Sequence, residues 1–363
     1  METIALINQK GGVGKTTTAA NLAAALAARG WTIAMVDLDP QAHLTMHFGV
    51  DPDQHNGGTY EILTQDLPLL DAMVEVGPNL SIVPSSLDLA GAEIELASVV
   101  GREQLLGDRF EADDLPYDFV LVDCPPSLSL LTLNALAAAD EVLIPLQPHF
   151  LALQGLGKLL ETVALVRRRI NPRLTVGGIV LCMYESNTRL ASEVTDDVAS
   201  FLAAQDDPNT PWAATKLYDT RVRRNVKLAE CPSFGESIFH YAPGCPGARD
   251  YEALAEEFLV AHGMVPNPPQ VTEADEAEQG GEGEGFSAAH GAAADVPGAT
   301  EAAPAEHDAE AAGEGQSGTR VEGRPSPFVV ADPPPALPRP PASEPVREQP
   351  GVGESPDEGD RAE

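Results

Sequence analysis

A glycine-rich segment near the start of the chain, KGGVGKTT at residues 10–17, has the residue types and the order needed to bind a phosphate chain. Its glycines allow the backbone to curve closely around an anion and to point N–H groups at it. Lys15 would place a compact positive charge at the β- and γ-phosphates, and the Thr16 hydroxyl would ligate Mg²⁺. A turn that carries lysines by chance would not have this spacing. The nucleotide-binding residues that it predicts are Gly11, Gly12, Val13, Gly14, Lys15, Thr16 and Thr17.

The residues around this segment have the patterns that a phosphate loop requires. An apolar run at 3–9 predicts a strand before it, and an Ala/Leu-rich stretch at 19–30 predicts a helix after it. The positive end of that helix would then face the anion. The segment departs from the G-x-x-x-x-G-K-[ST] pattern at its first position, where Gln9 stands, and it contains a second lysine, Lys10.

Three aspartates close predicted strands elsewhere in the chain. Asp37 and Asp39 end the run at 32–39, and Asp123 ends the apolar part of the run at 117–127. Ligands of open α/β sheets bind beyond the carboxyl ends of the strands, so these acids would meet the phosphate loop there. Asp123 has the position of a Walker B aspartate, which holds Mg²⁺. Of the other two, one can serve the metal and one can orient the attacking water; the alternative is a pair of solvated or helix-capping acids.

Strand and helix patterns alternate along the chain. Strands are predicted at 3–9, 32–39, 79–86, 117–127, 141–148, 175–184 and near 213–218, and further helices at 88–110, 131–140, 151–170, 190–204 and 247–263. The strands are continuous apolar runs, which is typical of a sheet that is covered on both faces. We therefore predict an α/β fold with a doubly wound, mostly parallel sheet and helices on both faces.

Composition divides the chain into two parts. The whole chain has a net charge of −34. Residues 265–363 contain 21 acidic and 5 basic residues and are rich in Ala, Glu, Gly and Pro. Such a segment buries too little apolar surface to fold, so we predict a disordered tail after a folded domain at 1–264. The four cysteines lack C-x-x-C spacing, and no apolar run approaches the roughly 20 residues of a membrane span. A phosphate loop so close to Met1 argues against a signal peptide.

Several segments together resemble the ParA/Soj family of partition ATPases, which belongs to the deviant Walker A group of P-loop proteins. They are KGGVGKTTTAANLAAALAARG, VDLDPQA, AGAEIELA, DFVLVDCPPSL, LNALAAADEVLIPLQ and RNVKLAECPSFG. The resemblance extends in order over about residues 2–262. It implies a doubly wound α/β domain that binds ATP and Mg²⁺ as cofactors.

The resemblance also implies roles for individual residues. Lys10 matches the signature lysine, which reaches the nucleotide of the second subunit in an ATP-sandwich dimer, and Asp39 matches the acid that positions the attacking water. Lys10, Lys15 and Asp39 would thus be the catalytic residues. Thr16, Asp37 and Asp123 would serve the metal. Met183, Arg224 and Asn225 resemble the region around the adenine.

Double-stranded DNA, bound without sequence preference, is the second ligand that the resemblance implies. Residues 158–227 contain 11 of the 17 basic residues of 1–264, and only 8 acidic residues. They therefore form a local basic region on an acidic protein. Some of these residues, such as Arg167 to Arg169, could instead stabilise a helix C-terminus. The expected DNA contacts are Arg189, Arg221, Arg223 and Arg224.

The predicted function is an ATP hydrolase that dimerises on ATP, binds the nucleoid in the cytoplasm and segregates a chromosome or plasmid. Its partner would be a ParB-like centromere-binding protein that stimulates hydrolysis. A positioning ATPase for a cargo other than DNA and a scaffold that binds ATP without turnover remain alternatives. The acidic last helix disfavours a membrane-bound MinD-like regulator. The sequence has no suitable cysteine pair for a metal cluster, as a reductase like the nitrogenase iron protein would need. It also has no tyrosine-rich tail, as a bacterial tyrosine kinase would need.

Overall fold

The computed structural model describes residues 1–266 except 53, 55–56 and 205–206. The predicted tail at 265–363 lies outside the described residues from position 267 onward. In the described part, no helix is both long and apolar enough to cross a membrane.

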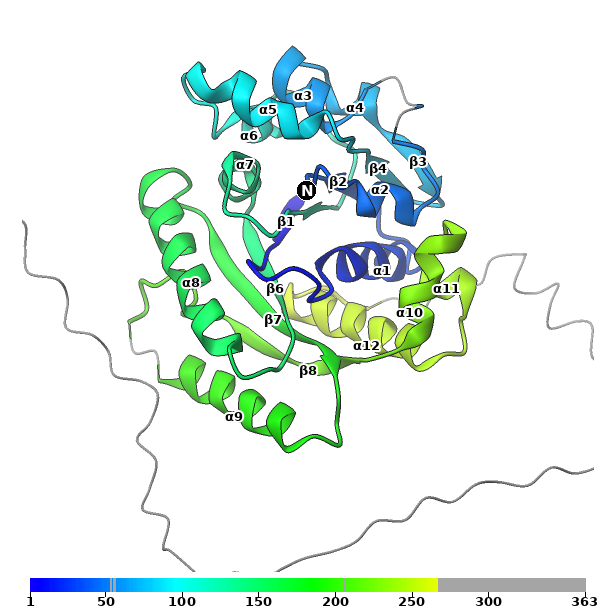
Figure 1. Ribbon diagram of the computed structural model, residues 1–363, viewed down its shortest axis with the longest axis vertical. Helices are drawn as coiled ribbons and strands as arrows, with labels where there is room; N and C mark the ends of the chain where they lie inside the picture. Colours follow the sequence, from blue (N-terminus) through cyan, green and yellow to red (C-terminus); the bar gives the residue numbers. More distant parts are fainter. Residues whose placement is uncertain (53, 55–56, 205–206, 267–363) are drawn as a thin grey trace, which may run out of the picture. The chain divides into compact units, whose positions relative to one another are not determined.

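The described part is built on one eight-stranded sheet with the order β3-β4-β2-β5-β1-β6-β7-β8 (Figure 1). All neighbouring pairs are parallel except β3 with β4. This confirms the predicted α/β class and its mostly parallel sheet. The strands are β1 (Glu2–Leu6), β2 (Ile33–Asp37), β3 (Val74–Gly77), β4 (Leu80–Val83), β5 (Phe119–Asp123), β6 (Glu141–Leu146), β7 (Thr175–Tyr184) and β8 (Lys216–Arg223).

Helices cover both faces of the sheet, and each face has its own hydrophobic core. Successive side chains of a strand point to opposite faces, so Ile4 and Leu6 of β1 join one core while Ala5 joins the other. The first core includes α1 (Lys15–Ala27), α2 (His43–His47), α10 (Val226–Glu230), α11 (Ile238–Tyr241) and α12 (Pro246–Ala261). The second includes α3 (Thr59–Gln65), α4 (Leu69–Ala72), α5 (Leu89–Glu95), α6 (Leu105–Ala112), α7 (Leu130–Ala138), α8 (Ala152–Arg169) and α9 (Arg189–Ala203).

The helix predicted at 88–110 is wrong as one element. The structure has α5, a 3₁₀ turn at Leu96–Ser98 and then α6, because Val99 is extended and Gly101 has a left-handed φ of 73°. Periodic apolar residues continue across this break, which hides it in the sequence.

The last strand also differs from its prediction. β8 occupies Lys216–Arg223 instead of 213–218, so Arg221 and Arg223 lie on a strand. The antiparallel strand β3 was not predicted, because a four-residue edge strand carries little periodicity.

Candidate active site

The glycine-rich segment lies between β1 and α1, at the carboxyl end of the central strand. Gly12 and Gly14 have φ angles of 71° and 97°, which favour glycine. Gly14 is the N-cap residue of α1, and neither a side-chain cap nor an acidic residue is present in the first turn. The positive end of α1 is therefore available to an anion.

Two buried aspartates face the first turn of α1. Asp37 of β2 and Asp123 of β5 are paired directly across the parallel ladder, so the fold places their carboxylates side by side. Thr16 Oγ1 donates a 2.6 Å hydrogen bond to Asp123 Oδ2. Asp37 Oδ2 accepts hydrogen bonds from the backbone N–H and the hydroxyl of Thr45, at 2.8 and 2.7 Å.

The donor set around Asp123 suits a hard divalent cation. Asp123 Oδ1 is buried and has no hydrogen-bond partner among the described residues. An unpartnered carboxylate oxygen beside a second carboxylate and a hydroxyl is the oxygen-rich surrounding that Mg²⁺ prefers. Thr16, Asp37 and Asp123 are thus brought together, and these residues fit a magnesium ion.

Burial makes these two carboxylates difficult to ionise. It raises the pKa of Asp123 to about 8, to which the charge of Asp37 contributes. It also raises the pKa of Asp37 to about 6, against the opposing hydrogen bonds from Thr45. Without a cation, the folded protein therefore keeps protons that the unfolded chain has already lost near pH 4.

This proton retention predicts a stability change with pH. Between about pH 4 and pH 8, Asp123 holds more protons in the folded state than in the unfolded state, so stability must fall as the pH rises through this window. Asp123→Asn removes the buried charge and should make the metal-free protein more stable than wild type at pH 8.5, with a smaller difference at pH 6. Urea unfolding in a chelator measures this. Asp108→Asn, at an exposed position on α6, should leave the pH dependence unchanged; a wild-type pH dependence in Asp123→Asn would contradict the prediction.

Asp39 lies at the edge of the same site and is half-buried. Two hydrogen bonds hold its backbone: its N–H donates to Asp37 Oδ1 at 3.2 Å, and its carbonyl accepts from Ser85 Oγ at 2.8 Å. Its carboxylate accepts the N–H of Gln41 at 3.0 Å and lines the cleft. A rigid backbone with a partly exposed carboxylate suits a group that positions a solvent molecule.

The glycine-rich segment lines a cleft of about 550 Å³, which is large enough for a nucleotide. Met183, a predicted adenine-side residue, lines it and has a left-handed φ of 51°. Pro232 and Ser233 line it as well; they were not predicted to bind the nucleotide, although they belong to the family-like segment RNVKLAECPSFG. Other missed lining residues are Gln41, His43, Met46, His47 and Pro126.

Arg224 and Asn225 are not among the residues that line this cleft. Arg224 Nη1 donates to Glu185 at 3.2 Å, and the Asn225 side chain caps α10 by accepting the N–H of Lys227. The predicted contact of these two residues with adenine remains a prediction.

Lys10 belongs to a different, neighbouring cleft. Its side chain is exposed and Nζ donates to Gln147 Oε1 at 3.2 Å, whereas Lys15 is 7% exposed and lines the nucleotide cleft. Lys10 and His149 line the second cleft, of about 540 Å³. The two lysines of the loop therefore point to different places.

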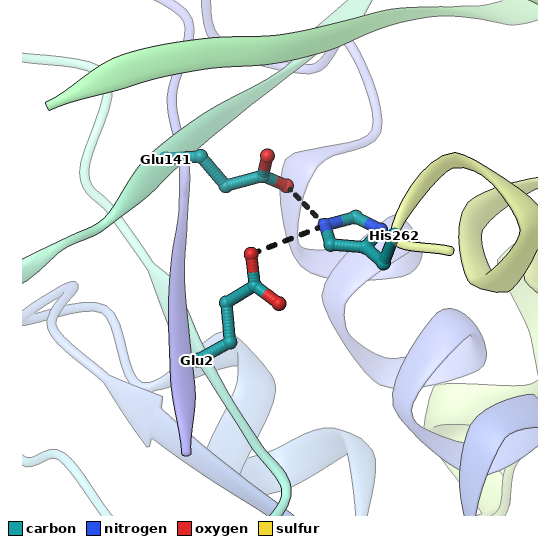
Figure 2. Close-up of side chains that lie close together, drawn as sticks. All are labelled: Glu2, Glu141 and His262. Atoms are coloured by element: carbon teal, nitrogen blue, oxygen red, sulfur yellow. Dashed lines mark hydrogen bonds and ion pairs between the residues drawn. The ribbon is translucent and has the colours of Figure 1, made fainter. Parts of the chain in front are cut away.

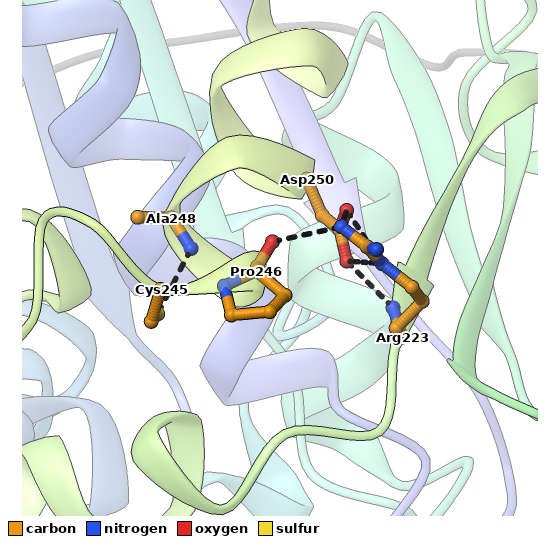
Figure 3. Close-up of polar contacts among 5 residues, drawn as sticks. All are labelled: Arg223, Cys245, Pro246, Ala248 and Asp250. Atoms are coloured by element: carbon orange, nitrogen blue, oxygen red, sulfur yellow. Dashed lines mark hydrogen bonds and ion pairs between the residues drawn. The ribbon is translucent and has the colours of Figure 1, made fainter.

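The four arginines that are predicted to contact DNA differ in how tightly other residues of the protein bind their side chains. Arg223 is bound to Asp250 of α12 through Nε and Nη2, with the shortest distance 2.6 Å (Figure 3). Arg221 lies over the Tyr184 ring at 4.7 Å and donates to its hydroxyl. The Arg189 side chain is 92% exposed and that of Arg224 is 75% exposed, each paired with one surface glutamate.

The Arg223–Asp250 pair is expected to stabilise the fold. Asp250 is nearly buried and also accepts the backbone N–H of Arg223, so Asp250→Ala leaves several donors unpaired. We expect a loss of about 2–3 kcal/mol in the free energy of unfolding, measured with urea. Glu193→Ala, which breaks the exposed pair with Arg189, is the matched control and should cost about 0.5 kcal/mol or less; equal losses would show that the Asp250 pair is only a surface contact.

Comparison with known proteins places this site among nucleotide-binding proteins. Residues 1–176 match the family model of an AAA domain. The chromosome partitioning protein ParA of Caulobacter vibrioides is 41% identical over 262 residues, which cover 71% of this chain and 94% of that protein. The chromosome-partitioning ATPase Soj of Thermus thermophilus is 44% identical over 256 residues, which cover 70% and 94%.

A solved structure with a bound nucleotide is also similar to this chain. Cobyrinic acid a,c-diamide synthase of Mycobacterium smegmatis, with bound ADP and magnesium, is 34% identical and has a TM-score of 0.61. The match covers 75% of this chain and 99% of that one.

Proposed function

The chain belongs to the ParA/Soj family of partitioning ATPases, and from this membership we propose that it hydrolyses ATP to ADP and phosphate with Mg²⁺ to segregate a chromosome or plasmid. The observation that carries the proposal is the cluster at the start of α1. Thr16 donates to Asp123, Asp37 lies beside Asp123, and Lys15 lines the same cleft. Phosphoryl transfer requires this combination of positioned charges more than covalent chemistry.

Within this proposal each residue of the site has one task. The N–H groups of the loop and the Lys15 ammonium bind and orient the phosphates. Thr16, Asp37 and Asp123 would hold Mg²⁺, which neutralises charge on the phosphate oxygens. Asp39, at the edge of the cleft, orients the attacking water.

Lys10 is the residue that we assign to a second subunit. It is exposed, lies outside its own nucleotide cleft and has only Gln147 as a side-chain partner among its described hydrogen bonds. A lysine in this position can reach the phosphates of a partner that faces it. ATP would then stabilise a dimer, and hydrolysis would release it.

We further propose that the dimer binds double-stranded DNA without sequence preference, in the cytoplasm and on the nucleoid, and that a ParB-like protein stimulates hydrolysis. Arg221, Arg224 and Arg189 gather around the segment 184–189, where their charges can meet phosphates. The charge of Arg223 is already neutralised by Asp250, so we expect Arg223 to contribute less to DNA binding than the other three arginines.

The DNA contact predicts a charge-reversal effect. Arg189→Glu combined with Arg224→Glu should weaken DNA binding at least about tenfold, because two phosphate contacts are replaced by repulsion. The slope of log K against log salt should decrease by about 2 in magnitude. Fluorescence anisotropy with duplexes of unrelated sequence measures both. Arg102→Glu, at an exposed position before α6, is the control; unchanged binding in the double variant would place the DNA face elsewhere.

Phosphate release by the purified full chain tests the proposed function as a whole. Turnover that depends on Mg²⁺ and increases with DNA and a ParB-like protein is expected. Turnover without any response to DNA would favour the positioning of a cargo other than DNA, and nucleotide binding without turnover would indicate a scaffold. A MinD-like role is disfavoured, because α12 carries Glu252, Glu256 and Glu257 instead of a basic face.

A further inference from the structure

A second group of ionisable side chains lies at the amino ends of the strands, on the side of the sheet away from the phosphate loop. Glu2 begins β1, Glu141 begins β6, and His262 directly follows α12 (Figure 2). The phosphate loop and the three aspartates follow the carboxyl ends of strands, whereas this group lies at their amino ends. Neither the proposed hydrolysis nor the proposed DNA contact uses these residues.

The donor atoms of the group converge. His262 Nε2 lies 3.1 Å from Glu141 Oε1 and 3.5 Å from Glu2 Oε1. One donor atom of each residue lies within 4.8 Å of those of the other two. Two ligands of a tetrahedral zinc ion with bonds of about 2.0–2.1 Å are about 3.3 Å apart. Both distances from His262 Nε2 are therefore close to the separation of two zinc ligands, and they also fit hydrogen bonds.

The other nitrogen of His262 sets the orientation of the ring. Nδ1 lies 2.7 Å from the carbonyl oxygen of Phe258, which can only accept, so Nδ1 carries a proton. Nε2 is then directed at the two carboxylates, with either a proton or a metal ion between them. Metal-binding histidines are commonly oriented by such a bond to a backbone carbonyl. The rings of Phe258 and Phe119 pack against the imidazole and limit its movement.

The surrounding structure makes room for Glu141. A Cβ atom at position 177 would lie 2.0 Å from Glu141 Oε2, so a side chain at this position of β7 would displace the carboxylate from its present place. The neighbouring acid Asp140 is occupied elsewhere, because it accepts the N–H of Thr3 and pairs with Arg173. The side chains of Glu141 and His262 are 11% and 8% exposed, whereas that of Glu2 is 35% exposed and leaves a path for an ion.

We propose that Glu2, Glu141 and His262 bind a divalent transition-metal ion, with Zn²⁺ the best match, and that this ion ties the end of α12 to β1 and β6. One imidazole nitrogen with two carboxylates suits Zn²⁺ and Co²⁺, whereas Mg²⁺ and Ca²⁺ prefer oxygen ligands alone. Water supplies the remaining position. The bound ion would hold together the beginning of the chain and its last described helix.

Cobalt titration of the full chain, free of a histidine tag and stripped with a chelator, tests the site. Co²⁺ should bind with the intense visible absorption of a four-coordinate ion, and Zn²⁺ should displace it. Glu141→Gln and His262→Gln should each weaken binding by at least about 10- to 100-fold. His240→Gln, which replaces an exposed histidine, is the control and should bind Co²⁺ as the wild type does.

Three results would overturn the proposal. No absorption in the wild type would mean that the group is an ion pair of a protonated His262 with two glutamates. Absorption that persists in both Glu141→Gln and His262→Gln would place the ion elsewhere. If His262→Gln does not fold, Glu2→Gln decides instead, because the half-buried Glu2 can be replaced with little disturbance: weaker cobalt binding supports the site and unchanged binding refutes it.

Discussion

Asp39→Ala should slow ATP hydrolysis about 10²–10⁴-fold while nucleotide binding persists. Asp39 lines the cleft but has no hydrogen bond to Lys15 or Thr16, the residues that we assign to the phosphates and the metal. Removing it should therefore take away the group that we propose orients water and leave the phosphate site intact. In the proposed cycle hydrolysis releases the dimer, so this variant should accumulate as an ATP-bound dimer on DNA. Phosphate release and binding of a fluorescent ATP analogue separate the two effects.

The control for this experiment is Asp108→Ala, which removes an equal charge from an exposed position on α6. It should hydrolyse ATP as the wild type does. Normal turnover in Asp39→Ala would refute the assigned role, and a parallel loss of nucleotide binding would show that Asp39 mainly supports the loop around β2.

Lys10→Ala should abolish the ATP-dependent dimer and leave nucleotide binding to the single subunit largely intact. The lysine is exposed and lines the neighbouring cleft, so a monomer loses little when it is truncated. In the proposed dimer the same charge is buried against phosphates, where truncation costs about 2–5 kcal/mol. Light scattering after size-exclusion chromatography with a non-hydrolysable ATP analogue measures the dimer.

Lys158→Ala provides a matched control, because Lys158 lines the same cleft as Lys10. It should dimerise as the wild type does. A stable dimer of Lys10→Ala, or a loss of nucleotide binding in the monomer, would instead mean that Lys10 acts within its own subunit.

Local patterns account for what could be predicted. The glycines, Lys15 and Thr16 fall within eight consecutive residues between a strand and a helix, and their spacing alone indicates a phosphate loop. The parallel sheet follows from continuous apolar strands that alternate with helices. The break at Val99–Gln104 and the short strand β3 escaped prediction, because neither changes the local periodicity.

The fold class, the phosphate loop and the aspartates at the ends of β2 and β5 can be inferred from local patterns in the sequence. The tertiary structure brings together residues that are distant in the chain: Asp37 lies beside Asp123, Arg223 binds Asp250, and Glu2 lies with Glu141 and His262. It also decided that Lys10 and Lys15, five positions apart, line different clefts. The physical reason is that a helix or strand depends on neighbours within a few residues, whereas these contacts depend on the order of strands in the sheet. The resulting arrangement brings together side chains that are distant in the chain, as with Glu2 and His262 near the two ends of the described part, and no local spacing indicates it.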